Sequence, residues 1–324
     1  MSKLTASLSL DLDNKWSYMK NNGAKGWEEY PSYLSIFVPY ILELLEELDL
    51  KLTFFIVGQD AAFEHNHEYI RMIAEAGHEI ANHSFKHETF LHLYSKEELE
   101  DEIDKAHSAI RAASGREPKG FRGPGFTWSE TVFEVLVERG YLYDSSTFPT
   151  IIGPLARMYY FRTSKLTAAQ KKERKELFGK FSDGFMKLKP YFWKLKNNRK
   201  LLEIPVTTMP LFRIPIHLTY LMYLSTLSEQ LMFLYLKCAL YLCKFTRTTP
   251  NFLIHPTDLL GEDMVSGMEF FPGMKISSHR KLEIFKKVIN IFARHFTLVT
   301  MEEYAAGIFE KYDKDVIIDQ KITH

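Results

Sequence analysis

Two aspartates stand at the end of the first apolar run of the chain. Asp11 and Asp13 close the run that begins at Leu4, in the sequence Asp-Leu-Asp. In a β-strand, residues two positions apart project from the same face, so both carboxylates can reach one site. Such a pair can hold a cation or accept a proton. Solvated acids are also common at strand ends, so the pair alone leaves both interpretations open.

Two histidines four residues apart follow a later apolar segment. His83 and His87 lie in the sequence Asn-His-Ser-Phe-Lys-His, and they share a face if this segment forms a helical turn. Two imidazoles and one carboxylate are a common ligand set for catalytic zinc, with one position left for water. The metal lowers the pKa of that water and so creates a nucleophile near neutral pH. The alternative is a pair of surface histidines in a histidine-rich region.

An arginine begins the glycine-rich sequence Arg-Gly-Pro-Gly-Phe at position 122. The guanidinium of Arg122 could orient a carboxylate through a fork of donors. The glycines and Pro124 would let the backbone approach a substrate closely. An ordinary turn with a surface arginine is the alternative.

A late histidine, His255, ends the apolar run 251–255 and precedes Pro256. An imidazole in this place could protonate a leaving amine as a general acid. The alternative is a structural histidine in the core or at its rim.

The order of these patterns is more informative than any one of them. Asp-x-Asp, His-x-x-x-His, Arg-Gly-Pro-Gly and Leu-x-His resemble, in chain order, the motifs of the NodB-homology polysaccharide deacetylases, carbohydrate esterase family 4. Segments 77–80, 140–146 and 202–206 also fit this family. The resemblance extends from Leu4 to about Leu260 and excludes segments 153–202 and 211–245.

The resemblance implies a distorted (β/α) barrel of about seven strands with a divalent metal, usually zinc. The implied metal ligands are Asp13, His83 and His87. Asp11 would be the general base that acts on metal-bound water, Arg122 would hold Asp11, and His255 would be the general acid. The metal and a backbone N–H near the Arg122 loop would stabilise the oxyanion. The residues assigned to substrate binding are Pro124, Gly125, Phe126, Trp128 and Asp144.

The chain departs from the family in two motifs. The first motif usually has adjacent acids, whereas segment 10–14 reads Leu-Asp-Leu-Asp-Asn. This variant resembles a subgroup that contains intracellular peptidoglycan-type deacetylases, metal-free allantoinase-like enzymes and a deformylase of undecaprenyl-linked aminoarabinose. The intact histidine pair argues against the metal-free branch. The fourth motif has no clean match, and Asp144, ahead of Asp258, is the nearest candidate for tuning the pKa of His255.

Alternating strands and helices must position these residues. Strands are expected at 4–12, 52–57, 78–82, 120–123, 141–144, 202–206, 252–255 and 296–300. Helices are expected at 33–48, 60–76, 95–114, 129–139 and 278–293, and Ser95 with Glu98 forms a capping-box pattern. This alternation predicts a parallel sheet covered by helices. The number of strands favours a barrel, and an open doubly wound sheet is the alternative. The candidate residues then fall at or just after strand ends, where barrel enzymes place their chemistry.

Two stretches interrupt this α/β pattern. Segment 153–202 holds fourteen Lys and Arg against three acids, a local net charge of +11, whereas the whole chain of 324 residues is neutral. Segment 211–245 is strongly apolar. We therefore divide the chain into 1–152 (first part of the barrel), 153–250 (a basic and apolar helical insertion that includes a barrel strand near 202–206) and 251–324 (the rest of the barrel). Basic residues among aromatics suit an anionic membrane surface. A capping subdomain with solvated charges is the alternative.

These features predict a metal-dependent hydrolase that removes an acetyl or formyl group from the nitrogen of an amino sugar, lipid-linked or nucleotide-linked. The alternatives are a ring amidohydrolase with a soluble substrate and a non-catalytic sugar- or lipid-binding module. The start of the chain lacks the apolar region of a signal peptide, which predicts a cytoplasmic enzyme, peripheral at the inner membrane face if the basic segment binds lipid. Zero net charge argues against nucleic acid as a partner.

Overall fold

The computed structural model describes residues 3–174, 181–271, 273–312 and 319–321. Within these residues one sheet of ten strands has the order β10-β6-β7-β5-β4-β3-β2-β1-β8, and β9 also pairs with β1. The strands are β1 Leu4–Leu12, β2 Thr53–Ile56, β3 Glu79–Asn82, β4 Gly120–Phe121, β5 Tyr143–Asp144, β6 Tyr191–Lys194, β7 Lys200–Glu203, β8 Asn251–Ile254, β9 Phe296–Val299 and β10 Asp319–Lys321. Every pair is parallel except β6 with β7.

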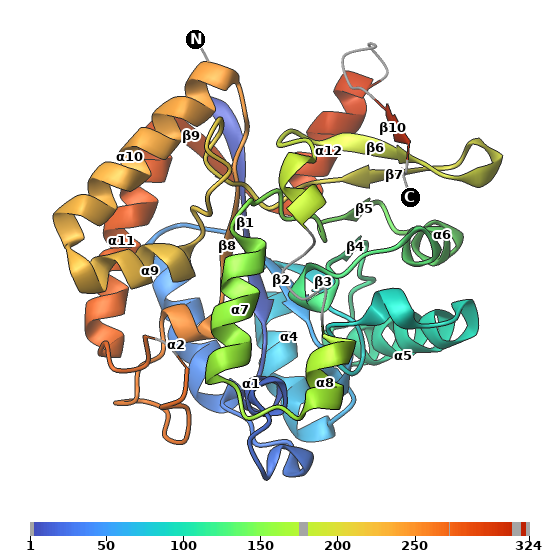
Figure 1. Cartoon of the computed structure of the whole chain (residues 1–324), viewed down its shortest axis with the longest axis horizontal. Coiled ribbons are helices and arrows are strands. Elements are labelled where there is room, and N and C mark those ends of the chain that lie inside the picture. The colour runs from blue at the N-terminus through green and yellow to red at the C-terminus, as the bar shows by residue number, and fades with distance from the viewer. Residues whose placement is uncertain (1–2, 175–180, 272, 313–318, 322–324) are drawn as a thin grey trace.

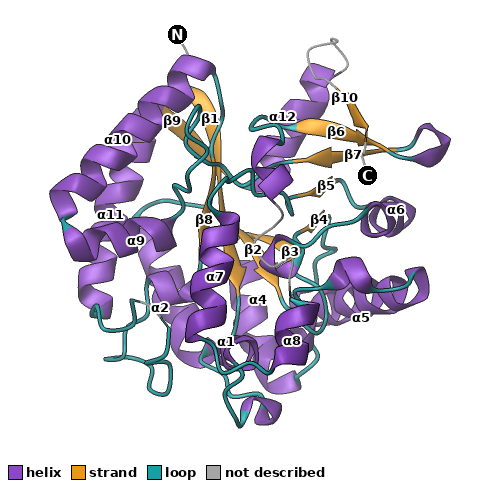
Figure 2. Ribbon diagram, in the orientation of Figure 1, coloured by secondary structure: helices purple, strands orange, loops and turns teal. Residues whose placement is uncertain are grey.

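The sheet curls into a distorted barrel with helices packed around it (Figures 1 and 2). The barrel closes where the chain after β7 meets the start of β8, while β6 and β10 continue the sheet beyond β7. There the N–H of Thr207 donates to the carbonyl of Asn251 at 3.1 Å, and the N–H of Asn251 donates to the Thr207 hydroxyl at 2.8 Å. The predicted α/β barrel is confirmed.

The sequence of β1 explains how the barrel separates its polar interior from its apolar outer layer. Leu8 and Leu10 belong to the main apolar core under the helices. The alternate residues Ser9 and Asp11 are also buried, but they contact the polar side chain of Arg122. Because successive side chains of a strand point to opposite faces, this alternation places the first catalytic candidate inside the barrel.

The helices follow the expected positions with a few differences. They are α1 Lys15–Asn22, α2 Leu34–Glu47, α3 Gly58–Ala61, α4 His67–Glu75, α5 Lys96–Ser114, α6 Glu130–Glu138, α7 Gly153–Thr163, α8 Ala168–Glu173, α9 Leu218–Leu227, α10 Glu229–Thr246, α11 Ser278–His295 and α12 Met301–Tyr312. The capping box of Ser95 and Glu98 is present at α5. The expected single helix 60–76 is instead split into α3 and α4, because the Asn66 side chain turns back to donate to the carbonyl of Asp60.

The basic segment contains helices and the expected barrel strand near 202–206, together with one strand, β6, that was not expected. Its second half forms β6 and β7, joined by a turn in which Asn197 and Asn198 have φ of 57° and 58°. The three aromatic residues of β6 are buried, so the aromatic content of this region also fills core. Among the described residues, no helix is long and apolar enough to cross a membrane.

Candidate active site

Three buried side chains converge just beyond the carboxyl ends of β1 and β3. Asp13, His83 and His87 each offer a ligand atom, and these atoms lie within 4.8 Å of one another. Oδ1 of Asp13 is 2.9 Å from Nε2 of His87 and 3.4 Å from Nε2 of His83. This oxygen accepts no well-directed hydrogen bond from the described residues. A buried carboxylate oxygen that faces two imidazole nitrogens fits a divalent cation.

The carboxyl group of Asp13 is ionised in spite of its burial. Burial alone would raise the pKa of Asp13, but the charge of His87 and contacts with both histidines hold it well below its usual value. Nδ1–H of His83 donates to the carbonyl of Arg122 at 2.6 Å. This bond fixes the tautomer that leaves Nε2 available as a ligand, the arrangement commonly found around metal-bound histidines.

The loop that carries the two histidines differs from the expected helical turn. Ser84 and His87 have φ of 62° and 55°, so the chain makes tight left-handed turns between the ligands. Oε1 of the buried Glu102 accepts the N–H groups of Phe85 and Lys86 at 3.0 and 2.7 Å. The rings of His83 and His87 nevertheless lie in contact, with centroids 5.0 Å apart, because Glu102 holds the loop that joins the two residues.

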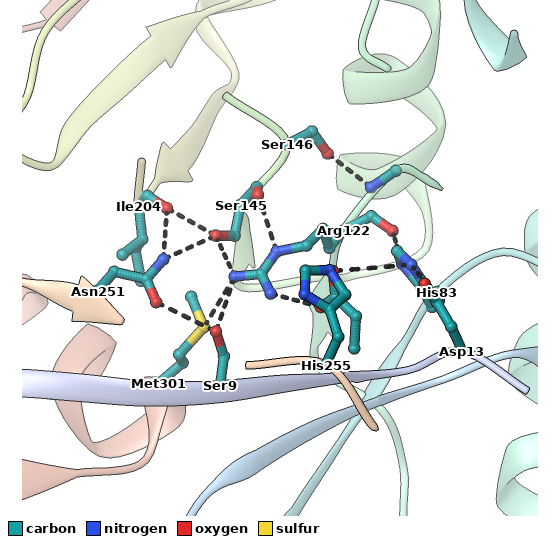
Figure 3. A network of polar contacts seen from close by, with 12 residues as sticks. Ser9, Asp13, His83, Arg122, Ser145, Ser146, Ile204, Asn251, His255 and Met301 are labelled. Atoms are coloured by element: carbon teal, nitrogen blue, oxygen red, sulfur yellow. Dashed lines mark hydrogen bonds and ion pairs between the residues drawn. The ribbon is translucent and has the colours of Figure 1, made fainter. Parts of the chain in front are cut away.

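Arg122 is fully buried and holds Asp11 from inside the barrel. Nη1 of Arg122 donates to Oδ1 of Asp11 at 2.5 Å. The expected fork onto one carboxylate does not form, since Nη2 donates to the hydroxyls of Ser9 and Ser145 at 3.1 and 2.9 Å instead. Nε donates to the Ser145 carbonyl at 3.1 Å (Figure 3). The guanidinium also lies over the ring of Phe55.

The second oxygen of Asp11 is left facing the site. Its Oδ2 lies 3.9 Å from Nε2 of His83 and 3.9 Å from Nε2 of His255. The carboxylate therefore stands between the metal ligands and the late histidine, with its other oxygen engaged by Arg122. This is a suitable position for a group that takes a proton from a water molecule in the site.

His255 follows β8 and faces Asp11 across the site. Burial would lower its pKa, but the Asp258 carboxylate near Nδ1, together with the charges of Asp11 and Asp13, raises it to about 9. Nδ1 lies 3.6 Å from Asp258 and 3.2 Å from the hydroxyl of Thr219. The imidazole is therefore protonated at neutral pH, as a general acid must be.

Asp258, not Asp144, is the acid beside His255, so the order of the two candidates was wrong. The turn Pro256–Asp258 brings Asp258 back to accept the N–H of His255 at 2.8 Å. Asp144 instead accepts the N–H and hydroxyl of Ser146 at 2.9 and 2.7 Å and adjoins Glu203. Asp144 is completely buried, and its assignment to substrate binding stays a prediction.

The other residues assigned to substrate binding divide into two groups. Trp128 stacks on Phe133 and Trp193, at centroid distances of 5.7 and 5.4 Å, and these two rings also contact each other, so half-exposed Trp128 packs against the edge of a core cluster. Pro124 is buried, while Gly125 and Phe126 are half-exposed in the loop after Arg122. Both Gly125 and Phe126 have positive φ, 64° and 62°.

No functional role was predicted for His217, which precedes α9 and is buried beside His255. Its ring centroid is 6.0 Å from that of His255 and 5.6 Å from that of Phe148. Burial and the charge of His255 lower the pKa of His217 to about 3, so it is neutral. Glu102 was also missed, although its place on the apolar face of α5, between Leu99 and Ile103, was a detectable signal.

Comparison with known proteins points to one family. Residues 26–143, which include both histidine ligands and Arg122, match the family described as polysaccharide deacetylase. A peptidoglycan deacetylase of Helicobacter pylori is 30% identical over 147 residues, 43% of this chain and 48% of that protein. A chitooligosaccharide deacetylase of Bradyrhizobium is 32% identical over 103 residues, 32% of this chain and 46% of that protein. The chain thus spans about half the length of these curated relatives.

The fold has a counterpart of nearly the same extent. A solved structure described as a polysaccharide deacetylase from Mycobacterium smegmatis superimposes with a TM-score of 0.62 at 19% identity, covering 100% of this chain and 95% of that one. The ordered motifs and the matched residues 26–143 agree, so this part of the chain resembles the polysaccharide deacetylases, and the solved structure shows that the barrel fold is shared.

Proposed function

We propose that the protein is a metal-dependent hydrolase that removes an acetyl or formyl group from the nitrogen of an amino sugar. The observation that carries this proposal is the placement of Asp11 between two groups of opposite role. One side of its carboxylate faces the Asp13, His83 and His87 cluster, and the other faces a protonated His255. Amide hydrolysis needs a base and an acid at one centre, and this site provides both.

Asp13, His83 and His87 would hold a divalent ion, for which we propose zinc. A zinc ion at this position would lower the pKa of a water molecule and polarise the amide carbonyl. All three ligands are buried, so the protein also excludes bulk water around the ion. A site that excludes bulk water has a low dielectric constant, which strengthens each electrostatic interaction within it.

The chain's own groups then divide the proton transfers between them. Oδ2 of Asp11 accepts a proton from the attacking water while Arg122 fixes the other carboxylate oxygen. The water oxygen bonds to the carbonyl carbon, the carbon–nitrogen bond breaks, and His255 gives its proton to the departing amine. The Asp258 carboxylate near Nδ1 keeps His255 charged until that transfer, and Nε2 faces the reacting groups.

The loop after Arg122 is our candidate for the oxyanion donor. The N–H groups of Gly123, Phe126 and Thr127 already donate, to Ser146, Gly123 and Pro124 respectively. We therefore assign the role to the N–H of Gly125. A Cβ at Gly123 would meet the carbonyl of Thr127 at 2.1 Å, so the tight shape of this loop requires glycine there.

The linkage of the substrate and the place where the protein acts are further predictions. The substrate is proposed to be lipid-linked or nucleotide-linked, and the protein is proposed to act in the cytoplasm, at the inner membrane face if it binds lipid. Relatives named for peptidoglycan and chitooligosaccharide make N-acetylglucosamine units the first substrates to test.

The decisive experiment measures bound metal and acetate release in parallel. Purified protein is analysed for metal content and assayed on acetylated glucosamine oligosaccharides before and after treatment with chelator, and after addition of zinc. We expect activity to disappear with the metal and to return with it. His83→Ala and His87→Ala should lose metal and activity together, whereas His279→Ala, at an exposed histidine on α11, should lose neither. Activity that survives both chelator and the two ligand variants would exclude the metal mechanism.

A further inference from the structure

A group of apolar side chains is exposed on and beside α7. Four exposed apolar residues lie on one face at helical spacing, three on α7 and one just before it: Ile151, Leu155, Met158 and Tyr159. Leu155 is 60% and Met158 64% exposed. The adjacent short helix Phe181–Phe185 exposes Phe181 and Phe185, and a nearby turn exposes Leu211 and Phe212. We call these eight residues the α7 surface. Scattered exposed apolar residues are normal, but a contiguous group marks an interaction site.

Hydrogen bonds join the parts of the α7 surface. Nη1 of Arg213 donates to the carbonyls of Gly184 and Met186 at 2.7 and 2.6 Å, so the turn at 211–212 is held against the short helix. The N–H of Ile151 donates to the Arg213 carbonyl at 3.2 Å, which ties the start of α7 to the same turn. The exposed apolar groups therefore share one region of the molecule.

The charge around α7 is positive, and the one acid of the short helix Phe181–Phe185, Asp183, is only 8% exposed. From Gly153 to Lys172 the sequence contains five basic residues and no acid. Arg162, Lys165 and Lys172 are exposed. A second copy of the chain would bring like charges together across a symmetric interface, whereas an anionic lipid surface complements both the charge and the apolar side chains.

The α7 surface also adjoins the candidate active site. At one end, Thr150 donates its N–H to the carbonyl of Phe148, whose ring packs on His217 beside His255. At the other end, the N–H of Lys165 donates to the carbonyl of Asn22 at 2.8 Å, in the helix that follows Asp13. In Figure 1, α7 lies on the near side of the molecule, between α9 and α8.

We propose that the α7 surface docks the protein on an anionic lipid bilayer, with α7 lying in the plane of the headgroups. An 11-residue helix is about 16 Å long, too short to span a bilayer and suited to lie at its interface. Docking goes beyond the proposed deacetylation and does not need it. If that proposed function holds, docking brings lipid-linked acylamino sugars to the site.

The test is sedimentation of the full chain with vesicles of phosphatidylcholine alone or in equal mixture with phosphatidylglycerol. We expect binding to the anionic vesicles only, weakened by added salt. Arg162→Glu with Lys165→Glu should lower the partition coefficient at least tenfold, since each basic residue near an anionic surface contributes roughly fivefold. Leu155→Ser with Met158→Ser should remove the binding that persists in salt.

A matched control carries the same kinds of change at the opposite edge of the sheet. Leu142→Ser with Arg116→Glu alters exposed residues just before β5 and β4, at the amino ends of the strands, and should bind as the wild type does. A second comparison, the α10 variant, is Leu234→Ser with Phe245→Ser on the outer side of α10, where these residues are 58% and 83% exposed. Each variant is first shown by thermal unfolding to be as stable as the parent.

Three outcomes would overturn the proposal. One is the absence of binding to anionic vesicles at low salt. Another is loss of binding by the α10 variant but not by the α7 variants, which would move the lipid contact to α10. The third is a dimer in lipid-free solution that Leu155→Ser with Met158→Ser dissociates, which would assign the surface to a second copy. His83→Ala should bind vesicles normally even when inactive, so failure of catalysis and failure of docking are distinguishable.

Discussion

Oδ2 of Asp258 lies 3.6 Å from Nδ1 of His255, while Nε2 of the same ring lies 3.9 Å from Asp11. The imidazole of His255 thus lies between two carboxylates. Asp258 stabilises its positive charge, and Asp11 is the proposed general base. Burial opposes protonation of His255, but the nearby acids outweigh it and raise its pKa to about 9. The turn after β8 therefore sets the protonation state of the proposed general acid.

Asp258→Asn should shift the alkaline limb of the pH–activity profile to lower pH. The acid form of His255 exists below its pKa, and the substitution removes the first of the charges that raise this pKa. At a pH above both values, activity should fall about tenfold for each unit by which the pKa drops. The measurement is kcat/KM of acetate release against pH. An unchanged alkaline limb would show that another group is the acid.

Arg122→Gln should destabilise the protein because it leaves the Asp11 charge buried without its partner. Breaking a buried ion pair by removing one member costs roughly 3–5 kcal/mol. Asp11 is 4% exposed and Arg122 is fully buried, so solvent does little to reduce this cost. The free energy of unfolding in urea provides the measurement. The double variant Asp11→Asn with Arg122→Gln should recover part of the loss, and a double variant less stable than Arg122→Gln alone would contradict the account.

Glu102→Leu should weaken metal binding although Glu102 is not a ligand. Its Oε1 accepts both N–H groups that hold the loop between His83 and His87. Loss of such a supporting contact typically costs 10- to 100-fold in metal affinity. Glu102→Gln is the matched control, because it keeps an oxygen acceptor and should retain most of the affinity. Calorimetric titration of metal into metal-free protein distinguishes the two, and equal affinities would exclude the role of Glu102.

The sequence predicted the parts of the fold and site that depend on local periodicity. The alternation in β1 defined which face carries Asp11, and the chain order of strands and helices indicated a barrel. The candidate ligands could be grouped because parallel strands end at one edge, so residues that follow β1 and β3 approach each other.

Features that depend on tertiary contacts could not be predicted in the same way. β6 was missed because its aromatic residues are embedded in a basic segment, and pairing with β7 and β10 makes them a strand. Asp144 was ranked above Asp258 because the sequence does not show that its carboxylate is engaged by Ser146. Trp128 follows an active-site loop in the sequence, yet its ring stacks on Trp193 from β6.

Glu203→Gln should reduce the dependence of stability on pH. Burial, followed by the charge of Asp144, raises the pKa of Glu203 well above its usual value, and burial also raises that of Asp144. Unfolded carboxyls lose their protons near pH 4, so above that pH the folded state binds more protons than the unfolded state. Stability contributed by this pair is therefore complete below about pH 4 and declines as the pH rises toward the folded pKa.

Replacing Glu203 by Gln removes one of the two titrating groups, so the variant should lose less stability than the wild type between pH 5 and 8. This range spans roughly three pH units and lies above the pKa of an unfolded carboxyl group. Trp193 donates to Oε2 of Glu203 at 3.1 Å, and this bond is lost in the amide if Thr147 keeps the oxygen. The slope of unfolding free energy against pH, rather than its value at one pH, is therefore the proper measurement. Glu43→Gln at an exposed position should leave the slope unchanged. Parallel curves for Glu203→Gln and the wild type would mean that Glu203 is already ionised in the folded protein.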